Sequence, residues 1–284
     1  MTSYTRSNTL GKAKKTASKT LIFIFLMIML IIMVVPFLWM LSASLKYNQE
    51  IFSSTSWIPQ HARWSNYKDV WTQINFPVYY LNTIKLSVVI TTLQLFTCSC
   101  AAYAFSRLHF PGRDKLFLVY LATMMVPWQA IMIPQFVIIK SMGLYNTHWS
   151  LILVNAFSVF GAFLLRQFML GLPTELSEAA RIDGCNEFQI YWRIIMPLTK
   201  PSLATLTVFT FTFVWNDYLA PMIYLSDDNL KTIQLGLTFF RSTYSAEYGL
   251  IMAGTVCSLI PIIAIYAFAQ KYLVKGVAFT GLKG

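Results

Sequence analysis

The chain has 284 residues, of which 56% are hydrophobic and only 12% are charged. A soluble globular domain carries about a quarter charged residues, so this composition excludes an ordinary water-soluble protein and indicates that most of the surface faces lipid. The net charge of +11 does not point to nucleic acid, because the basic residues lie between apolar runs and form no continuous basic stripe.

Six apolar segments are long enough, or nearly so, to cross a bilayer, which takes about 20 residues of helix. Their length assigns them as helices rather than strands. Prolines inside several of these runs are expected to kink them. The sequence therefore predicts an all-α polytopic membrane protein with six transmembrane helices. In chain order these lie between Lys19 and Lys46, Lys85 and Arg107, Lys115 and Lys140, Lys140 and Arg166, Lys200 and Asp227, and Glu247 and Lys271.

The distribution of Lys and Arg predicts the orientation of these helices, because cytoplasmic loops are enriched in positive charge. One alternate set of connecting regions holds 15 of the 22 basic residues and the other holds 6, with Lys85 at a helix end. The richer set is predicted to be cytoplasmic, which places both termini inside the cell. The predicted organisation is a cytoplasmic tail (1–19), a first transmembrane helix (20–45), an extracytoplasmic loop (46–81), a five-helix core (82–274) and a cytoplasmic tail (275–284).

The predicted cytoplasmic loop before the fifth transmembrane helix contains start and stop signals for two short helices. Thr174 is expected to cap the first helix, and Gly184 to end it in the left-handed conformation that glycine adopts most readily. Asn186 and Gln189 have the spacing of a capping box at the start of the second helix, which Pro197 is expected to end.

This loop, residues 172–201, mixes apolar and charged residues, and its Ala179 and Ala180 would allow a close approach to another surface. Such a segment could lie on the lipid headgroups, cap the helical bundle or insert into a groove on a partner protein. The residues alone leave these three alternatives open.

Two short motifs in the loop resemble a known family. They are EAARIDG at residues 178–184 and IIMPL at residues 194–198, and together they resemble the EAA loop of binding-protein-dependent ABC import permeases. Cys185 and Met196 depart from the usual Ala and Leu, and both changes are small. In that family the loop forms a coupling helix that fits a cleft on the nucleotide-binding subunit. The resemblance therefore implies an ATPase-docking role for Glu178, Ala179, Ala180, Asp183 and Gly184.

The C-terminal sequence is similar to the tail of the maltose-transporter-type carbohydrate permeases, in QKYLVKG at residues 270–276 and TGLKG at 280–284. The similarity implies a carbohydrate substrate, specifically an oligosaccharide, and ATPase contacts for Gly281, Leu282, Lys283 and Gly284. A single helix before a five-helix core fits the same subfamily. The implied partners are a second homologous permease, two ABC ATPase subunits and an extracytoplasmic solute-binding protein, assembled in a bacterial cytoplasmic membrane.

Catalytic chemistry is not expected in this chain. It has no phosphate-binding loop of the form GxxxxGK[ST], so ATP and Mg²⁺ would be bound by the partner ATPase and no cofactor by this subunit. The sequence also shows no Ser/His/Asp set, no paired carboxylates and no Cys/His spacing typical of a metal site.

Asp217 is an acid inside an apolar run, and intramembrane acids often mark transport pathways. With Asn216 and Gln129 it is a candidate for the polar lining of a pathway. Asp217 could equally make an interhelical hydrogen bond, or be the coupling residue of an ion-gradient-driven secondary transporter, which is the alternative function. Secondary transporters usually contain inverted repeats, and no clear internal repeat is seen here.

Overall fold

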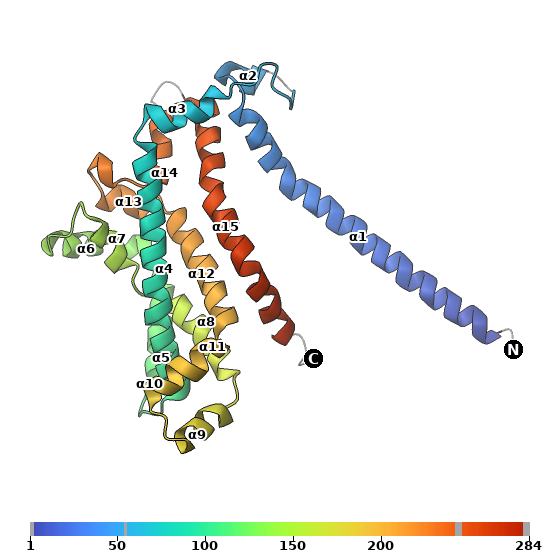
Figure 1. Ribbon diagram of the computed structural model, residues 1–284, viewed down its shortest axis with the longest axis vertical. Helices are drawn as coiled ribbons and strands as arrows, with labels where there is room; N and C mark the ends of the chain where they lie inside the picture. Colours follow the sequence, from blue (N-terminus) through green and yellow to red (C-terminus); the bar gives the residue numbers. More distant parts are fainter. Residues whose placement is uncertain (1–2, 54–55, 242–245, 281–284) are drawn as a thin grey trace. The chain divides into compact units, whose positions relative to one another are not determined.

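The computed structural model describes residues 3–53, 56–241 and 246–280, and the side chains within residues 18–272 of these ranges. The described part of the chain consists of helices and their connections and contains no β-strand, which confirms the all-α prediction (Figure 1). Gly281, Leu282, Lys283 and Gly284, the predicted ATPase-contact tail, lie outside the described residues.

The chain divides into two compact units, each described here by itself. Unit 1 comprises Met1–Val70 and Thr243–Val256, and therefore contains α1 (Ser3–Ser44), α2 (Asn48–Ser53), most of α3 (Ser65–Gln73) and the first residues of α15 (Tyr248–Thr280). Large apolar side chains are exposed all along the span Ser18–Ser44. A helix that is apolar on every side belongs in lipid or against another apolar protein surface.

Polar side chains join the elements of unit 1 at the end of α1. The buried side chain of Asn66 donates from Nδ2 to the carbonyl oxygens of Ser44 (2.9 Å) and Lys46 (3.1 Å). Asn48 accepts a hydrogen bond from the Tyr248 backbone N–H at 2.8 Å and donates to the Ala246 carbonyl at 2.6 Å. These side chains satisfy backbone groups where the helices end, and so fix the start of α15 beside α2.

Unit 2 comprises Trp71–Ser242 and Cys257–Gly284 and is built around α4 (Phe76–Arg107). Helices α8 (Val159–Leu170) and α12 (Lys200–Trp215) pack along α4 (Figure 1). The three helices meet closely at Gly161, where an added Cβ would lie 2.9 Å from Cys98 Sγ and 3.1 Å from Leu206. Glycine at this position lets the three backbones approach one another.

Two of the six predicted spans, the third and the fourth, are broken rather than continuous, and a further bend lies between the loop of residues 172–201 and the fifth predicted span. Three helices are long and apolar enough to cross a membrane, and the number rises to six when each bent pair of helices is counted as one span. The pairs bend by 97° between Arg113–Met125 and Trp128–Ser141, by 42° between His148–Val154 and Val159–Leu170, and by 76° between Glu187–Leu198 and Lys200–Trp215.

Each bend occurs where residues that end helices interrupt the chain. Pro127 is extended (φ −65°, ψ 138°) and directly precedes α6 (Trp128–Ser141), which follows α5 (Arg113–Ala122) and the short 3₁₀ turn η1 (Thr123–Met125). Residues 155–158 separate α7 (His148–Val154) from α8. By contrast Pro36, Pro134 and Pro261 lie inside uninterrupted helices, so a proline alone does not decide where a span breaks.

The remaining short helices pack near the Phe76 end of α4. They are α13 (Leu219–Tyr224), η3 (Asp228–Leu230), α14 (Ile233–Leu237) and η4 (Thr238–Phe240). Tyr79 of α4 donates to Asp228 Oδ1 at 2.8 Å, and Thr83 Oγ1 accepts from the Ile233 N–H at 2.9 Å. The opposite end of α4, at Arg107, carries the loop between α8 and α12 (Figure 1).

Candidate functional site

The loop between α8 and α12 begins with a short helix that ends at a glycine. Helix α9 spans Glu175–Ile182, and Gly184 follows it with φ +84°, the left-handed conformation that the sequence predicts. The Cys185 N–H donates to the Ala180 carbonyl at 2.9 Å and the Gly184 N–H to the Arg181 carbonyl at 3.0 Å. This pair of bonds is a Schellman motif, which satisfies the last carbonyls of the helix and fixes the direction in which the chain leaves it.

The second helix of the loop starts with the predicted capping box. The Gln189 N–H donates to Asn186 Oδ1 and the Asn186 N–H to Gln189 Oε1, both at 2.9 Å, at the beginning of α10 (Glu187–Gln189). The prediction for Thr174 is wrong: this residue has helical backbone angles, and its side chain makes no capping hydrogen bond. Helix α9 therefore starts without a side-chain cap.

Pro197 does not end the second helix, contrary to the sequence prediction. The chain continues from α10 through a π-helical segment, η2 (Ile190–Ile195), and a short helix, α11 (Met196–Leu198). A π-helical turn is wider than an α-helical one, and this turn precedes the proline, which has no N–H to donate. The chain bends only at Thr199, before α12.

The five predicted docking residues do not all face the same way. Glu178, Ala179, Asp183 and Gly184 are exposed, whereas Ala180 is buried. Ala180 belongs to the core cluster that also contains residues of α4, α8, η2 and α12, namely Tyr103, Leu165, Met169, Ile190, Tyr191 and Leu206. The expectation that Ala179 and Ala180 together face another surface is therefore corrected: Ala180 packs inward, and Ala179 alone of the two is outward.

Three apolar side chains that sequence reasoning did not assign to the site are exposed on this loop. Ile182 is 86% exposed, Phe188 71% and Trp192 55%. The sequence shows that the loop mixes apolar and charged residues, but it does not show which of them point outward, since Ile190 of the same stretch is fully buried. The outward surface of the loop therefore consists of apolar side chains with charged side chains between them.

Arg107 fixes the loop to the end of α4. Its guanidinium is buried and donates to the Met169 carbonyl at 2.5 Å, to Leu172 at 2.8 Å and to Pro173 at 3.5 Å. These carbonyls close the C-terminus of α8 and begin the loop, where a cation is favoured by the helix dipole. A second contact joins Ser99 of α4 to the Tyr191 hydroxyl at 2.8 Å.

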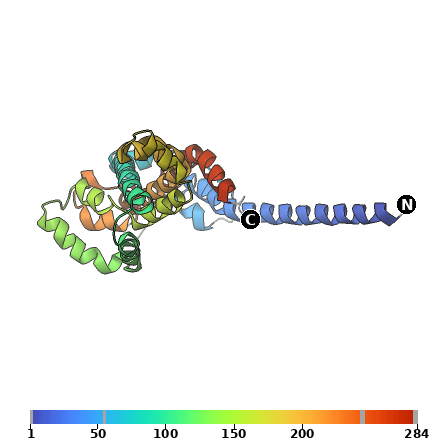
Figure 2. The same ribbon diagram turned by 90° about the horizontal axis from the view of Figure 1, so that it is seen from below.

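Glu187 connects three helices through one carboxylate. Oε1 accepts from Arg181 Nε of α9 at 2.8 Å, and Oε2 accepts from the Tyr103 hydroxyl of α4 at 2.6 Å. The carboxylate raises the pKa of the Arg181 guanidinium beside it. Viewed from below, the yellow helices of this loop lie beside the end of α4 (Figure 2).

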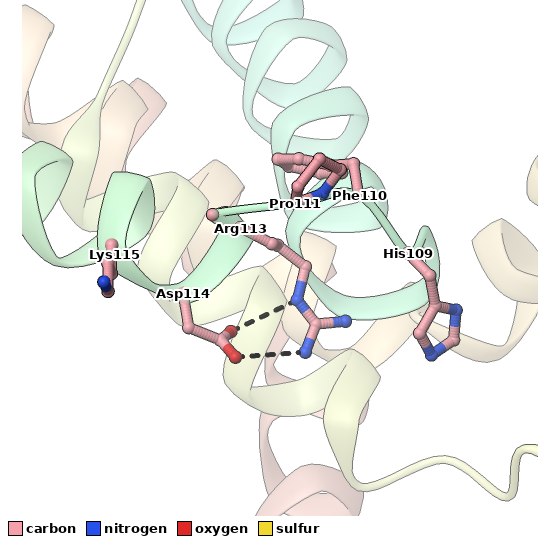
Figure 3. Close-up of a pocket in the computed structure, with 7 residues that line it drawn as sticks. His109, Phe110, Pro111, Arg113, Asp114 and Lys115 are labelled. Atoms are coloured by element: carbon pink, nitrogen blue, oxygen red, sulfur yellow. Dashed lines mark hydrogen bonds and ion pairs between the residues drawn. The ribbon is translucent and has the colours of Figure 1, made fainter.

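The turn between α4 and α5 lies at the same end of the unit and forms a shallow pocket of about 570 Å³ (Figure 3). Arg113 and Asp114 pair within it, with Nε to Oδ1 at 3.1 Å, and Arg166 of α8 adds a bond to the same Oδ1 at 3.2 Å. Asp114 is therefore paired with Arg113 and with Arg166, and the second pair connects α5 to α8. These three charged side chains bond one another and do not converge on a ligand.

The candidate pathway residues are only partly brought together. Asn216 and Asp217 line one groove of about 600 Å³, whereas Gln129 is exposed on α6 and is not among the residues lining that groove. Asp217 Oδ1 accepts from the Ala220 N–H at 3.2 Å. The acid thus caps the start of α13 locally, rather than making the interhelical hydrogen bond that the sequence left open.

A family model for the inner membrane component of binding-protein-dependent transport systems matches residues 95–279, which includes the end of α4 that carries Arg107 and the whole loop between α8 and α12. The chain belongs to this family. It is therefore a membrane-spanning permease of an ABC importer, which confirms the family predicted from the loop motifs and decides against a secondary transporter.

Relatives of this permease agree with the assignment. The chain is 34% identical to the probable ABC transporter permease protein YurM of Bacillus subtilis over 94% of its own length and 89% of YurM. It is also 34% identical to the lactose transport system permease LacG of Rhizobium radiobacter, with 85% and 88% covered. The fold matches a chain of a bacterial ABC transporter involved in alginate import, with TM-score 0.81, 25% identity and coverage of 92% and 98%.

The capping box of the permease loop can be tested with a matched pair of variants. Asn186→Ala should destabilise α10 by about 1 kcal/mol, because the Gln189 N–H loses its acceptor. Thr174→Ala should have little effect, since the Thr174 side chain caps nothing. Hydrogen exchange in detergent should become faster at Gln189 in the first variant alone; equal exchange in both variants would contradict the capping assignment.

Proposed function

We propose that this permease imports a neutral carbohydrate and that residues 172–201 are the docking site for a separate ATPase. A second, homologous permease would complete the pathway, and two ABC ATPase subunits would bind ATP and Mg²⁺, so this chain is non-catalytic and holds no cofactor. An extracytoplasmic binding protein would deliver the substrate. The substrate class is supported by the name of the lactose permease relative and by the side chains of two grooves.

The membrane orientation in this proposal follows from charge. Arg107, Arg113, Arg166 and Arg181 lie at one end of unit 2, together with the loop between α8 and α12. Basic residues collect on the cytoplasmic side. This end would therefore face the cytoplasm, with residues 1–19 and 275–284, whereas the loop of residues 46–81 would be extracytoplasmic.

The observation that carries the docking assignment is the exposed surface of the loop. Ile182 is 86% exposed between Arg181 and Asp183, which are also exposed. Lipid tails do not suit such a surface, because charged side chains are expensive in hydrocarbon. A protein groove can cover the apolar side chain and pair the neighbouring charges. An ATPase is the partner to which an importer of this family would attach.

Two adjoining grooves support a carbohydrate pathway. One, of about 410 Å³, is lined by Gln94, Asn155 and Thr210 together with Phe157 and other aromatic residues. The other, of about 600 Å³, contains Asn216, Asp217, Tyr218 and Tyr266. Phe209 and Phe213 of α12 line both grooves. Aromatic rings suit the C–H faces of a sugar ring, and amides and hydroxyls suit its hydroxyl groups.

The charged residues that line the grooves indicate whether the carbohydrate substrate is neutral or charged. Asp217 is the one charged residue among those lining the two grooves, and neither lining includes Lys or Arg. A carboxylated sugar would be repelled by this acid and would find no cation there to pair with. The grooves therefore favour a neutral substrate, in contrast to the acidic polysaccharide alginate imported by the structural neighbour.

Energy coupling is tested with the reconstituted assembly of this permease, its homologous partner, the ATPase and the binding protein. Uptake of labelled neutral di- and trisaccharides into proteoliposomes should require ATP and persist after an uncoupler dissipates the ion gradients. Uptake that continues without ATP and stops with the uncoupler would show that the proposed energy source is wrong.

ATPase docking is tested by adding bulk to the outward face of α9. Ala179→Trp should release the ATPase from the purified complex, because the side chain at this exposed position would lie between the two surfaces. Ser141→Trp, at an exposed position on α6, should leave the ATPase bound. The amount of ATPase that co-purifies with each permease variant is the measurement; equal retention would exclude this face as the docking surface.

The aromatic pathway is tested at Phe213. Phe213→Ala should lower uptake of the transported saccharide by about threefold to tenfold, since an aromatic contact contributes about 0.5–1.5 kcal/mol. Phe213→Tyr keeps the ring and should retain most of the uptake. Uronic acid oligosaccharides serve as the charged comparison and should not be imported. If both Phe213 variants transport like the unaltered permease, this ring does not line the pathway.

A further inference from the structure

The carboxylate of Glu187 is the point where α9, α10 and α4 meet through polar side chains. Arg181 approaches it from α9 at 2.8 Å and the Tyr103 hydroxyl from α4 at 2.6 Å. The Tyr103 hydroxyl also reaches the Glu187 backbone carbonyl at 3.3 Å. Hydrogen bonds to an ionised group are shorter and stronger than those between neutral groups, so the carboxylate holds Arg181 and Tyr103 close to one another.

This connection does not hold the fold together. The Arg181 and Glu187 side chains are 41% and 45% exposed, and ion pairs in contact with water contribute little to stability. The loop is attached to α4 by buried contacts instead, namely the Ser99–Tyr191 hydrogen bond and the bonds of Arg107 to the carbonyls of Met169 and Leu172.

The buried contacts join α4 to η2 and to the end of α8, but they do not reach the outward side chains of α9. Ala180 does touch the core from α9, but an alanine contributes only apolar contact, which is not directional. The charged bridge from Arg181 through Glu187 to Tyr103 is therefore the directional side-chain route from α9 to the membrane helix within the described residues.

We propose that Glu187 is a positioning residue for transport: it transmits the displacement of α9 to α4 through Arg181 on one side and Tyr103 on the other. The proposal rests on the proposed function, in which an ATPase moves α9. Glu187 then adds a second role to the loop, because the exposed face of α9 binds the ATPase whereas the carboxylate converts its movement into a movement of α4.

The test uses the complete reconstituted transporter with four single variants and one double variant of the permease. Glu187→Ala removes both side-chain hydrogen bonds, and Tyr103→Phe removes the bond to α4. Glu187→Gln keeps the shape and weaker forms of both bonds. Glu247→Gln is the matched control, since Glu247 is an exposed acid directly before α15 and lies outside the loop of residues 172–201. Co-purified ATPase, ATP hydrolysis and saccharide uptake are measured on each preparation.

Glu187→Ala and Tyr103→Phe should keep the ATPase bound and hydrolysing ATP, while saccharide uptake per ATP falls about fivefold or more, as expected for loss of a coupling between two sites. Glu187→Gln should recover part of the loss, and Glu247→Gln should behave like the unaltered permease. The double variant Tyr103→Phe/Glu187→Ala should lose no more than Glu187→Ala alone, since both changes break one route.

Unchanged uptake per ATP in Glu187→Ala and Tyr103→Phe, or losses that multiply in the double variant, would overturn the proposal. Release of the ATPase by Glu187→Ala would also overturn it, because Glu187 would then shape the docking surface rather than transmit movement. None of these three results contradicts the docking proposal. That proposal is contradicted separately if the Ala179→Trp variant retains the ATPase.

Discussion

The bilayer leaves backbone N–H and C=O groups without water, so each group must find a partner within the protein. In unit 2 this constraint is met at the break of residues 155–158, where side chains of α4 bond the freed carbonyls. Gln94 donates to Asn155 at 2.7 Å, Thr97 to Ala156 at 2.7 Å and Cys98 to Ser158 at 3.3 Å. Gln94, Thr97 and Cys98 of α4 therefore satisfy the backbone carbonyls of the broken helix. These hydrogen bonds allow α7 and α8 to meet at 42°.

The position of the break has a consequence for transport. Non-helical backbone at membrane depth is tolerated where it is buried in protein or lines a cavity, and here it does both. The Asn155 carbonyl is covered by α4, while Phe157 and Ser158 line the groove beside α12. Thr210 of α12 donates to Gln94 Oε1 at 2.9 Å, so α4, α12 and the break share one hydrogen-bond network next to the groove. A change in the packing of α4 against α12 would alter the groove directly.

Features of the loop that depend on neighbouring residues were predictable from the sequence, and those that depend on packing were not. Gly184 and the Asn186–Gln189 box follow local backbone chemistry, and both occur as predicted. The inward orientation of Ala180 depends on α4 and α8, and the bridge to Tyr103 joins residues that are 84 positions apart. Likewise composition and length indicate six apolar spans, but a proline such as Pro127 interrupts its span whereas Pro134 does not.

The loop therefore combines two kinds of attachment with different physical properties. Its apolar side, with Ala180, Ile190 and Tyr191, is closely packed in the core, where apolar contact holds the helices together without fixing a direction. Its exposed side carries Ile182 and Phe188, which gain stability when a partner covers them. A partner that binds the exposed side is thereby connected to α4, α8 and α12 through apolar contacts, and to α4 also through the directional Arg181–Glu187–Tyr103 bridge. In the proposed coupling, α9 and α10, joined at the Gly184 turn, carry a displacement from outside the membrane to the helices that line the grooves.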